Sequence, residues 1–199
     1  MTLFVVGLLL PTAADTLYLL FAQINAAVAE GEWWRLFTAA FLHAPTFFHV
    51  LFNMWALYVF GPQLERRVGG AAFATLYLSC AAAGGAAAYF LGNPFDVLVG
   101  ASGAIFGLFG VWLWNAFRAR ATPLGRAQLT QLLVLLGINA VLGFSVQNIS
   151  WQGHLGGLVA GVLIGALWSS PTVMKDPTRR VAVAAAVGGI AVLSVTLLG

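Results

Sequence analysis

The amino-acid sequence predicts an all-α fold, a polytopic bundle of transmembrane helices. The chain is 61% hydrophobic and only 8% charged, whereas soluble proteins carry about 25% charged residues. Its charge-free apolar runs follow one another, and each approaches the ~17–25 residues that a helix needs to cross the ~30 Å hydrocarbon core. Because these runs leave no room for a soluble domain, we expect one membrane domain over residues 1–199.

The first segment is the weakest of the expected helices. Leu3–Leu10 is apolar but stops at Pro11, and Leu17–Phe21 resumes only briefly. Eight residues cannot span a membrane, and no Lys or Arg precedes them as in a signal peptide. We expect a short or irregular first helix, which either continues through Pro11 with a kink or starts upstream of Met1.

Six further runs lack any charged residue, and each predicts one span. They are Phe47–Gly61, Ala71–Leu91, Val97–Phe117, Leu129–Val146, Gly153–Trp168 and Val181–Leu198. Together with the first segment they predict six core helices plus one C-terminal helix. Cys80 is the single cysteine and lies inside a span, so the chain has no disulfide framework.

Basic residues predict the orientation of the bundle. Eight of the nine Lys and Arg residues follow the second, fourth and sixth spans, and only Arg35 lies on the other side. Because cytoplasmic loops carry an excess of basic residues, these three loops are expected in the cytoplasm and the C-terminus outside. The net charge of +3 is then an orientation signal, and it requires no nucleic-acid partner.

Three polar residues are expected at one depth, although polar groups are costly inside a bilayer. Each precedes the expected cytoplasmic end of its span by 16 residues: His49 before Glu65, Ser102 before Arg118 and His154 before Ser170. At 1.5 Å per residue this is roughly 24 Å. All three therefore come about 6 Å below the outer surface of a ~30 Å core.

His49 and Asn53 are four residues apart and project from one helix face. An imidazole and an amide that share a face can donate to the oxyanion of a tetrahedral intermediate. Such a pair can also simply bond neighbouring helices. The matching depth of Ser102 and His154 favours the oxyanion interpretation.

Glycine spacing suggests how Ser102 and His154 come together. Glycines recur at every fourth position on two spans, and these are Gly153, Gly157, Gly161 and Gly165 on one and Gly103 and Gly107 on the other. Small residues at this spacing let helices approach closely in lipid. If the two series face one another, Ser102 and His154 come within hydrogen-bonding reach.

A serine and a histidine in this position predict a catalytic dyad. His154 would take the proton of Ser102 and later donate it to the leaving amine. Asp96 is the only carboxylate near the serine and belongs to a loop, so a third catalytic acid is not evident. His43, expected to be solvated or loop-bonded, and the other histidines lack the His-Glu-x-x-His spacing. We therefore expect no metal and no cofactor.

The order of these motifs resembles the rhomboid family of intramembrane serine proteases over nearly the whole chain. The segment 31–38, with Trp34 and Arg35, is similar to the family's Trp-Arg loop, and His49 to Asn53 matches its His-x-x-x-Asn motif. Gly61 to Gly69, with Glu65, matches the Gly/Glu/Gly signature. Gly100-Ala101-Ser102-Gly103 matches the nucleophile motif, and Gly153 to Gly157 the general-base helix.

The resemblance implies a role for each matching residue. Ser102 would be the nucleophile and His154 the general base. His49, Asn53 and the Ser102 main-chain N–H would form the oxyanion hole. Trp34 and Arg35 would fix a loop in the outer leaflet, Phe52 would lie near a substrate entrance between the second and fifth helices, and Phe106 would lie against the catalytic histidine.

The implied partners are the lipid bilayer and single-span membrane proteins, which would be cut near the outer face of their helix. Such a bond is accessible only where the substrate helix unwinds readily, as at Gly or Pro. A rhomboid-like protein that binds such helices without cutting them is the main alternative. A transporter with His49 and His154 as a proton relay is a third, but paired repeats and membrane carboxylates are lacking. Small size and the absence of a targeting segment favour a bacterial inner membrane.

Overall fold

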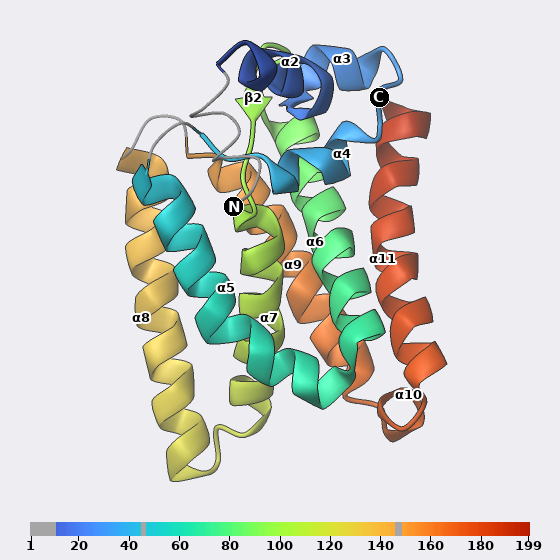
Figure 1. The fold of residues 1–199 in the computed structure, drawn as a ribbon. Coiled ribbons are helices and arrows are strands. Elements are labelled where there is room, and N and C mark those ends of the chain that lie inside the picture. Colours follow the sequence, from blue (N-terminus) through green and yellow to red (C-terminus); the bar gives the residue numbers. More distant parts are fainter. Residues whose placement is uncertain (1–10, 45–46, 146–148) are drawn as a thin grey trace.

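The computed structural model of the protein describes residues 11–44, 47–145 and 149–199. In this part of the chain six long helices run side by side as one bundle (Figure 1). They are α5 (Phe47–Val68), α6 (Gly70–Leu91), α7 (Ser102–Arg118), α8 (Pro123–Ser145), α9 (Trp151–Trp168) and α11 (Pro177–Leu198). The all-α bundle predicted from the sequence is confirmed, and each of the six longer apolar runs contributes a helix to it.

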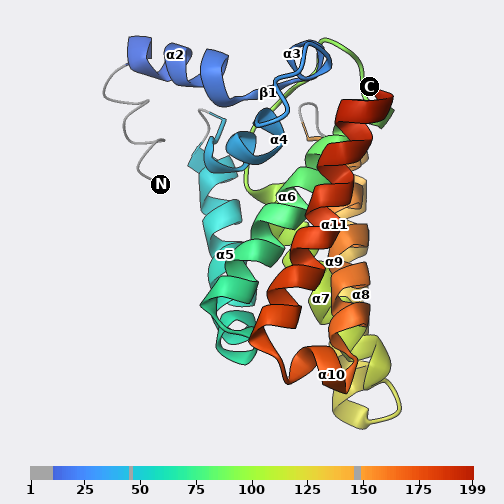
Figure 2. The ribbon, with the colours of Figure 1, turned by 90° about the vertical axis from the view of Figure 1, so that its right-hand side faces the viewer.

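Three of the described helices are long and apolar enough to cross a membrane by length and composition: Gly70–Leu91, Pro123–Gly143 and Pro177–Leu198. The other three long helices are too short or too polar to meet this criterion, each for a different reason. The helix α5 ends in charged residues, α7 has 17 residues, and α9 begins with polar side chains and carries several glycines. These three helices nevertheless run alongside the apolar ones (Figures 1 and 2).

The fourth predicted span begins later than the sequence suggested. Val97–Leu98 forms strand β2, which pairs antiparallel with strand β1 (Gln23–Ile24) in a small two-stranded sheet. Gly100 has φ +125°, a conformation that side-chain-bearing residues rarely adopt. This backbone turn separates the extended segment from the helix, so α7 starts at Ser102 instead of residue 97.

A layer of short elements covers the outer end of the bundle. It contains α2 (Pro11–Phe21), α3 (Asn25–Ala29), α4 (Arg35–Thr38) and the short 3-10 helix η1 (Ala39–Phe41). The helix α2 lies across the end of the bundle instead of along it (Figure 2). Its 11 residues agree with the short or irregular first helix expected, whereas Leu3–Leu10 lies outside the described residues.

Buried polar side chains hold this layer together and fasten it to the bundle. Arg35, only 5% exposed, donates to the carbonyl oxygens of Ala22 at 2.6 Å and Leu19 at 2.8 Å. Its Nε also pairs with Glu32 at 2.5 Å. The fully buried Gln23 donates to the carbonyl oxygen of Gly85 on α6 at 2.9 Å. A charged group is retained here because its hydrogen bonds compensate for lost hydration.

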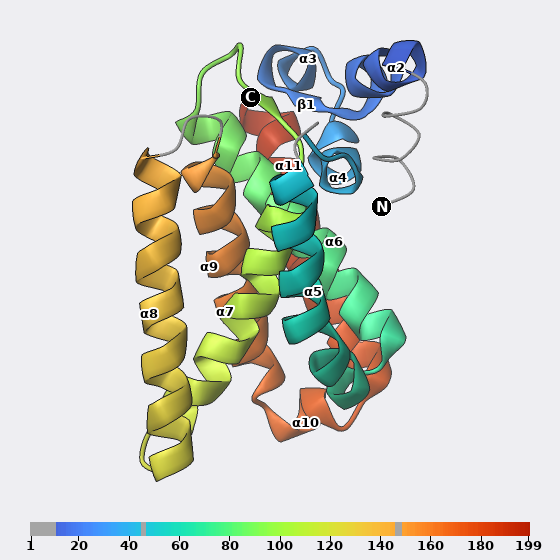
Figure 3. The same cartoon turned by 60° about the vertical axis from the view of Figure 1, so that its left-hand side comes forward.

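Basic and acidic residues separate to opposite ends of the bundle. The basic loops follow α5, α7 and α9, and all three lie at the end opposite the short-element layer (Figures 1 and 3). The acidic Asp15, Glu30, Glu32 and Asp96 belong to that layer and its loops. The C-terminus of α11 lies at the layered end (Figure 1). The three basic loops, expected on one side of the membrane, therefore lie at one end of the bundle.

Candidate active site

Ser102 is the first residue of α7. The N–H groups of a first helical turn have no partner within the helix, and the helix dipole places partial positive charge there. Gly100 precedes it with positive φ, and Ala101 at the helix boundary is fully buried. The turn therefore presents a hydroxyl and unpaired N–H donors together, at the outer end of the bundle.

His154 lies on α9, one turn from the helix start at Trp151. Its ring stacks on Phe106 of α7, with centroids 4.1 Å apart and an interplanar angle of 11°. Because Phe106 follows Ser102 by four residues, both project from the same face of α7. The stack therefore orients the imidazole on the face of α7 that carries the serine, as the resemblance implied for Phe106.

The two glycine series do face one another. A Cβ built on Gly157 would lie 1.9 Å from the carbonyl oxygen of Gly103, and one on Gly161 would lie 1.9 Å from that of Gly107. These are main-chain contacts, and the helices α7 and α9 pack more extensively than any other pair among the described elements. The close approach predicted from spacing is confirmed, and it holds the Ser102 and His154 ends of the two helices at one level.

Among the described residues, no hydrogen bond joins Ser102 Oγ to the His154 ring. Both side chains are partly buried, and the two helices that carry them touch within one turn of each residue. Catalytic hydrogen bonds are often long until a substrate is bound. The structure thus places the two residues on adjacent helices in direct contact, but it does not show the hydrogen bond between them that the glycine spacing led us to expect.

His49 on α5 turns one ring nitrogen toward the serine. The main-chain N–H of Ala44 donates to His49 Nδ1 at 3.1 Å, so a neutral ring carries its proton on Nε2. A Cβ built on Gly100 would lie 2.8 Å from that Nε2 and 3.9 Å from Ser102 Oγ. His49 Nε2–H and Ser102 therefore lie on either side of Gly100, where any larger residue would displace the ring.

Asn53 lies one turn after His49 and is 6% exposed. Its Nδ2 donates to the carbonyl oxygen of His49 at 2.8 Å, which occupies one of the two amide hydrogens. No second hydrogen bond of this amide group is found among the described residues. The Asn53 side chain thus bonds back to the main chain of His49, and the two residues are linked within one turn of α5.

His43 is placed differently from the expectation of a solvated side chain. It is 7% exposed, and neither ring nitrogen has a partner among the described residues. Its ring centroid lies 5.7 Å from that of His49, and its carbonyl oxygen accepts from the Tyr18 hydroxyl. The cause is the short-element layer, which covers the loop and excludes water. Burial, and secondly the charge of His49, lower the pKa of His43 from 6.5 to about 4.

The remaining residues expected in the site lie on the surface of α5, in the outer layer and at the opposite end of the bundle. Phe52 is 64% exposed on α5 and stacks with Phe48. Trp34 and Arg35 belong to the outer layer, where Trp34 packs edge-on against Trp33. Glu65 is at the opposite end, and its main-chain oxygen accepts from Gly69 N–H at 2.8 Å in the turn between α5 and α6.

A polar network under the outer layer was not predicted from the sequence. Asn25 donates to the carbonyl oxygens of Ala88 and Asn93, each at 3.0 Å, and Gln23 donates to Asn25. These amides sit in a stretch without hydrophobic periodicity, before the first long span. A Cβ on Gly85 would lie 2.5 Å from Gln23 Oε1. The glycine at position 85 is therefore the sequence feature that agrees with the close contact between Gln23 and α6. The network positions the layer that covers the site.

These features define a helical membrane protein with a serine and two histidines gathered at one end of its bundle. The Rhomboid domain family model matches residues 30–171. YdcA of Bacillus subtilis (strain 168) is 42% identical over 144 residues, which are 72% of this chain and 71% of that protein. Rhomboid protease GluP from the same organism is 39% identical over 160 residues, or 80% of this chain and 31% of that protein.

A third relative matches a longer stretch of the chain. Rhomboid-like protease 1 of Toxoplasma gondii is 35% identical over 185 residues, which cover 88% of this chain and 61% of that protein. The chain thus spans less than two thirds of the length of this relative and of GluP. With the family model matching most of its length, the chain belongs to the rhomboid family and is an integral membrane protein.

Proposed function

We propose that this protein is an intramembrane serine endopeptidase that cleaves single-span membrane proteins near the outer face of their transmembrane helix. The observation that carries the proposal is the pairing of α7 and α9. Their main chains touch at Gly103 and Gly157, and the His154 ring stacks on Phe106, one turn from Ser102. Names of the relatives GluP and Rhomboid-like protease 1 include the word protease, which supports the same activity.

In the proposed reaction Ser102 Oγ attacks the carbonyl carbon of the scissile bond while His154 takes its proton. The resulting oxyanion accepts hydrogen bonds from the Ser102 main-chain N–H, from His49 Nε2–H and from Asn53. The C–N bond then breaks as the His154 imidazolium protonates the leaving amine. A water molecule, deprotonated by His154, hydrolyses the acyl-enzyme and restores the Ser102 hydroxyl.

Each donor has a structural reason to serve this step. The Ser102 N–H is free because it opens a helix, and His49 carries its proton on Nε2 because Nδ1 accepts from Ala44. Removing one oxyanion donor in another serine protease lowers the rate about 10²–10³-fold. The substrate segment must leave its helix to reach these groups, so we expect cleavage near Gly or Pro residues.

We place the protein in a bacterial inner membrane, as one domain over residues 1–199. The relatives from Bacillus subtilis support the bacterial assignment, and the basic loops at one end support an orientation with the candidate site toward the outer face. The proposal includes no metal and no cofactor, because a serine, a histidine and N–H donors suffice for this reaction.

The test compares purified protein with its Ser102→Ala and His154→Ala variants on a fluorescent single-span reporter. Each substitution should reduce cleavage to background while the melting temperature stays within a few degrees, because each removes the same covalent step. Ser194→Ala is the matched control, since its hydroxyl bonds only within α11, and it should retain full activity. Reporter binding without any cleavage by the native chain would instead identify a helix-binding protein without protease activity.

A further inference from the structure

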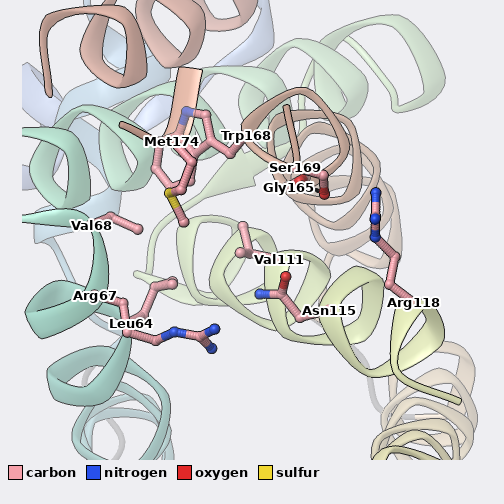
Figure 4. A pocket seen from close by; sticks show the side chains of 10 residues that line it. All are labelled: Leu64, Arg67, Val68, Val111, Asn115, Arg118, Gly165, Trp168, Ser169 and Met174. Carbon is pink, nitrogen blue, oxygen red and sulfur yellow. Dashed lines mark hydrogen bonds between the residues drawn. The ribbon is translucent and has the colours of Figure 1, made fainter. Parts of the chain in front are cut away.

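A polar cavity lies at the end of the bundle opposite Ser102. It encloses about 250 Å³ between the ends of α5, α7 and α9 and the short helix α10 (Pro171–Met174). Its polar lining comes from Arg67, Arg118, Asn115 and Ser169. In Figure 4 the Arg67 side chain points from α5 toward Asn115 of α7, and Arg118 lies on the side of Ser169.

Neither arginine of this cavity has an acidic partner among the described residues, whose ion pairs are Arg35 with Glu32 and Arg179 with Asp176. Arg67 lies with its guanidinium carbon 5.7 Å from the centre of the Trp112 ring, and its carbonyl oxygen accepts from Arg180 at 3.4 Å. The Arg180 Nε is itself buried without a partner. Two guanidinium groups therefore line the cavity, and no acidic side chain among the described residues pairs with either of them.

The apolar part of the lining is rigid. Leu64, Val68, Val111 and Trp168 are each at most 2% exposed and belong to the main hydrophobic core. Ser169 is fixed as well, because it accepts from Trp114 Nε1 at 2.8 Å and donates to the Gly165 carbonyl oxygen at 2.9 Å. The cavity thus offers two cations and an amide above a preformed apolar floor.

The geometry points to a binding site for a phosphate group, and specifically for the headgroup of an anionic phospholipid of the cytoplasmic leaflet. Guanidinium groups bind phosphate with two parallel hydrogen bonds, and basic pockets between transmembrane helices on the cytoplasmic side bind anionic headgroups. The loops at this end carry eight basic and two acidic residues. A lipid is favoured over free phosphate because the cavity combines cations with an apolar wall at the membrane surface.

Occupation of this site would join the helices that carry the candidate catalytic residues. The helix α5 bears His49 and Asn53, α7 bears Ser102, and α9 bears His154, while their opposite ends line the cavity. A ligand that binds only the folded arrangement stabilises it by mass action. The proposed lipid would therefore raise the melting temperature, whether or not the protein cleaves a substrate.

The test measures lipid retention by native mass spectrometry, and melting temperature, in a neutral detergent with added phosphatidylglycerol or phosphatidylcholine. We expect one phosphatidylglycerol to be retained and to raise the melting temperature, with no effect of phosphatidylcholine. The double variant Arg67→Gln/Arg118→Gln should bind more than about tenfold more weakly. Arg66→Gln/Arg120→Gln is the matched control, because it removes equal charge from the same loops but from residues outside the cavity lining, and it should behave as the parent.

An equal response of the two double variants would overturn the proposal, because it would reduce the effect to general surface charge. Sodium phosphate, compared with sodium chloride at equal ionic strength, should leave the melting temperature unchanged. A rise equal to that with phosphatidylglycerol would contradict a lipid ligand. Should the arginine variant fail to fold, Asn115→Phe fills the cavity with both arginines kept, and it should lose phosphatidylglycerol retention. Undiminished retention by that variant would also reject the site.

Discussion

The helices on the two sides of Ser102 are held in very different ways. Toward α9, glycine main chains touch, and any Cβ at Gly157 or Gly161 would overlap a carbonyl oxygen. The helix α5, by contrast, contacts α7 far less extensively and exposes Phe52 and its aromatic neighbours. The serine and its candidate base are therefore held together by direct main-chain contact, whereas the helix with His49 and Asn53 packs on α7 over a smaller contact.

Gly157→Leu should have the largest effect, because it inserts a side chain where two main chains touch. Overpacking of this kind costs typically ~1–3 kcal/mol and sometimes more. We expect a large fall in melting temperature and loss of cleavage, measured on the same preparation. Gly137→Leu on α8 is the control, since a Cβ there meets nothing within 4 Å, and it should change neither quantity. An unchanged melting temperature for Gly157→Leu would contradict a tight contact.

Asn53→Ala should come next, and its effect should fall on rate. Loss of an oxyanion donor lowers the rate about 10²–10³-fold, or ~2.7–4 kcal/mol. Three donors can partly replace one another, so a smaller loss is expected for Asn53→Ala or His49→Ala alone and a greater loss for the double variant. Initial rates and melting temperatures decide the matter. A large fall in melting temperature, with the rate per folded molecule retained, would indicate a purely structural pair.

Phe106→Leu should have a moderate effect, since it removes the ring that stacks on His154. Aromatic stacking contributes about 0.5–1.5 kcal/mol, so we expect a loss in cleavage rate of at most about tenfold. Phe106→Tyr keeps the stack and should remain near the parent activity. Equal losses in the two variants would show that ring stacking is not what orients the imidazole.

His43→Gln should have the smallest effect, visible only in the pH dependence of stability. Because burial lowers the pKa of His43 from 6.5 to about 4, the unfolded chain binds a proton that the folded chain does not between these values. Stability should therefore be full above pH 6.5 and fall as the pH decreases toward 4. Melting curves at several pH values should show a shallower fall in His43→Gln. Identical profiles for parent and variant would contradict the burial of a neutral imidazole.

The long helices, and the polar residues expected at one depth within them, were predicted better from the sequence than the contacts between segments. Helical arithmetic brought Ser102, His49 and His154 to one end, and glycine spacing predicted which helices meet, because both follow from regular geometry within one helix. The start of α7 at Ser102 was not predicted, because the positive φ of Gly100 overrides an apolar run. The burial of His43 and the anchoring of Gln23 were not predicted either, since both depend on how an irregular layer folds over the bundle.

The polar cavity at the end of the bundle opposite Ser102 could be predicted only in part. Counting basic residues located the charge at one end, and the positive-inside rule explains that bias without any ligand. Arg67 and Arg118 are 51 positions apart in the chain. They line one cavity with Asn115 because α5 packs against α7. No periodicity in the sequence encodes this juxtaposition.

Labelling by a fluorophosphonate probes the proposed pairing of Ser102 with His154 without any substrate. The adduct should map to Ser102 by peptide mass spectrometry, and labelling should be lost in Ser102→Ala. It should be strongly slowed in His154→Ala, whose fold is checked by its melting temperature, because the histidine across the glycine contact activates the hydroxyl. An adduct at another residue, or an unchanged labelling rate without His154, would contradict the dyad.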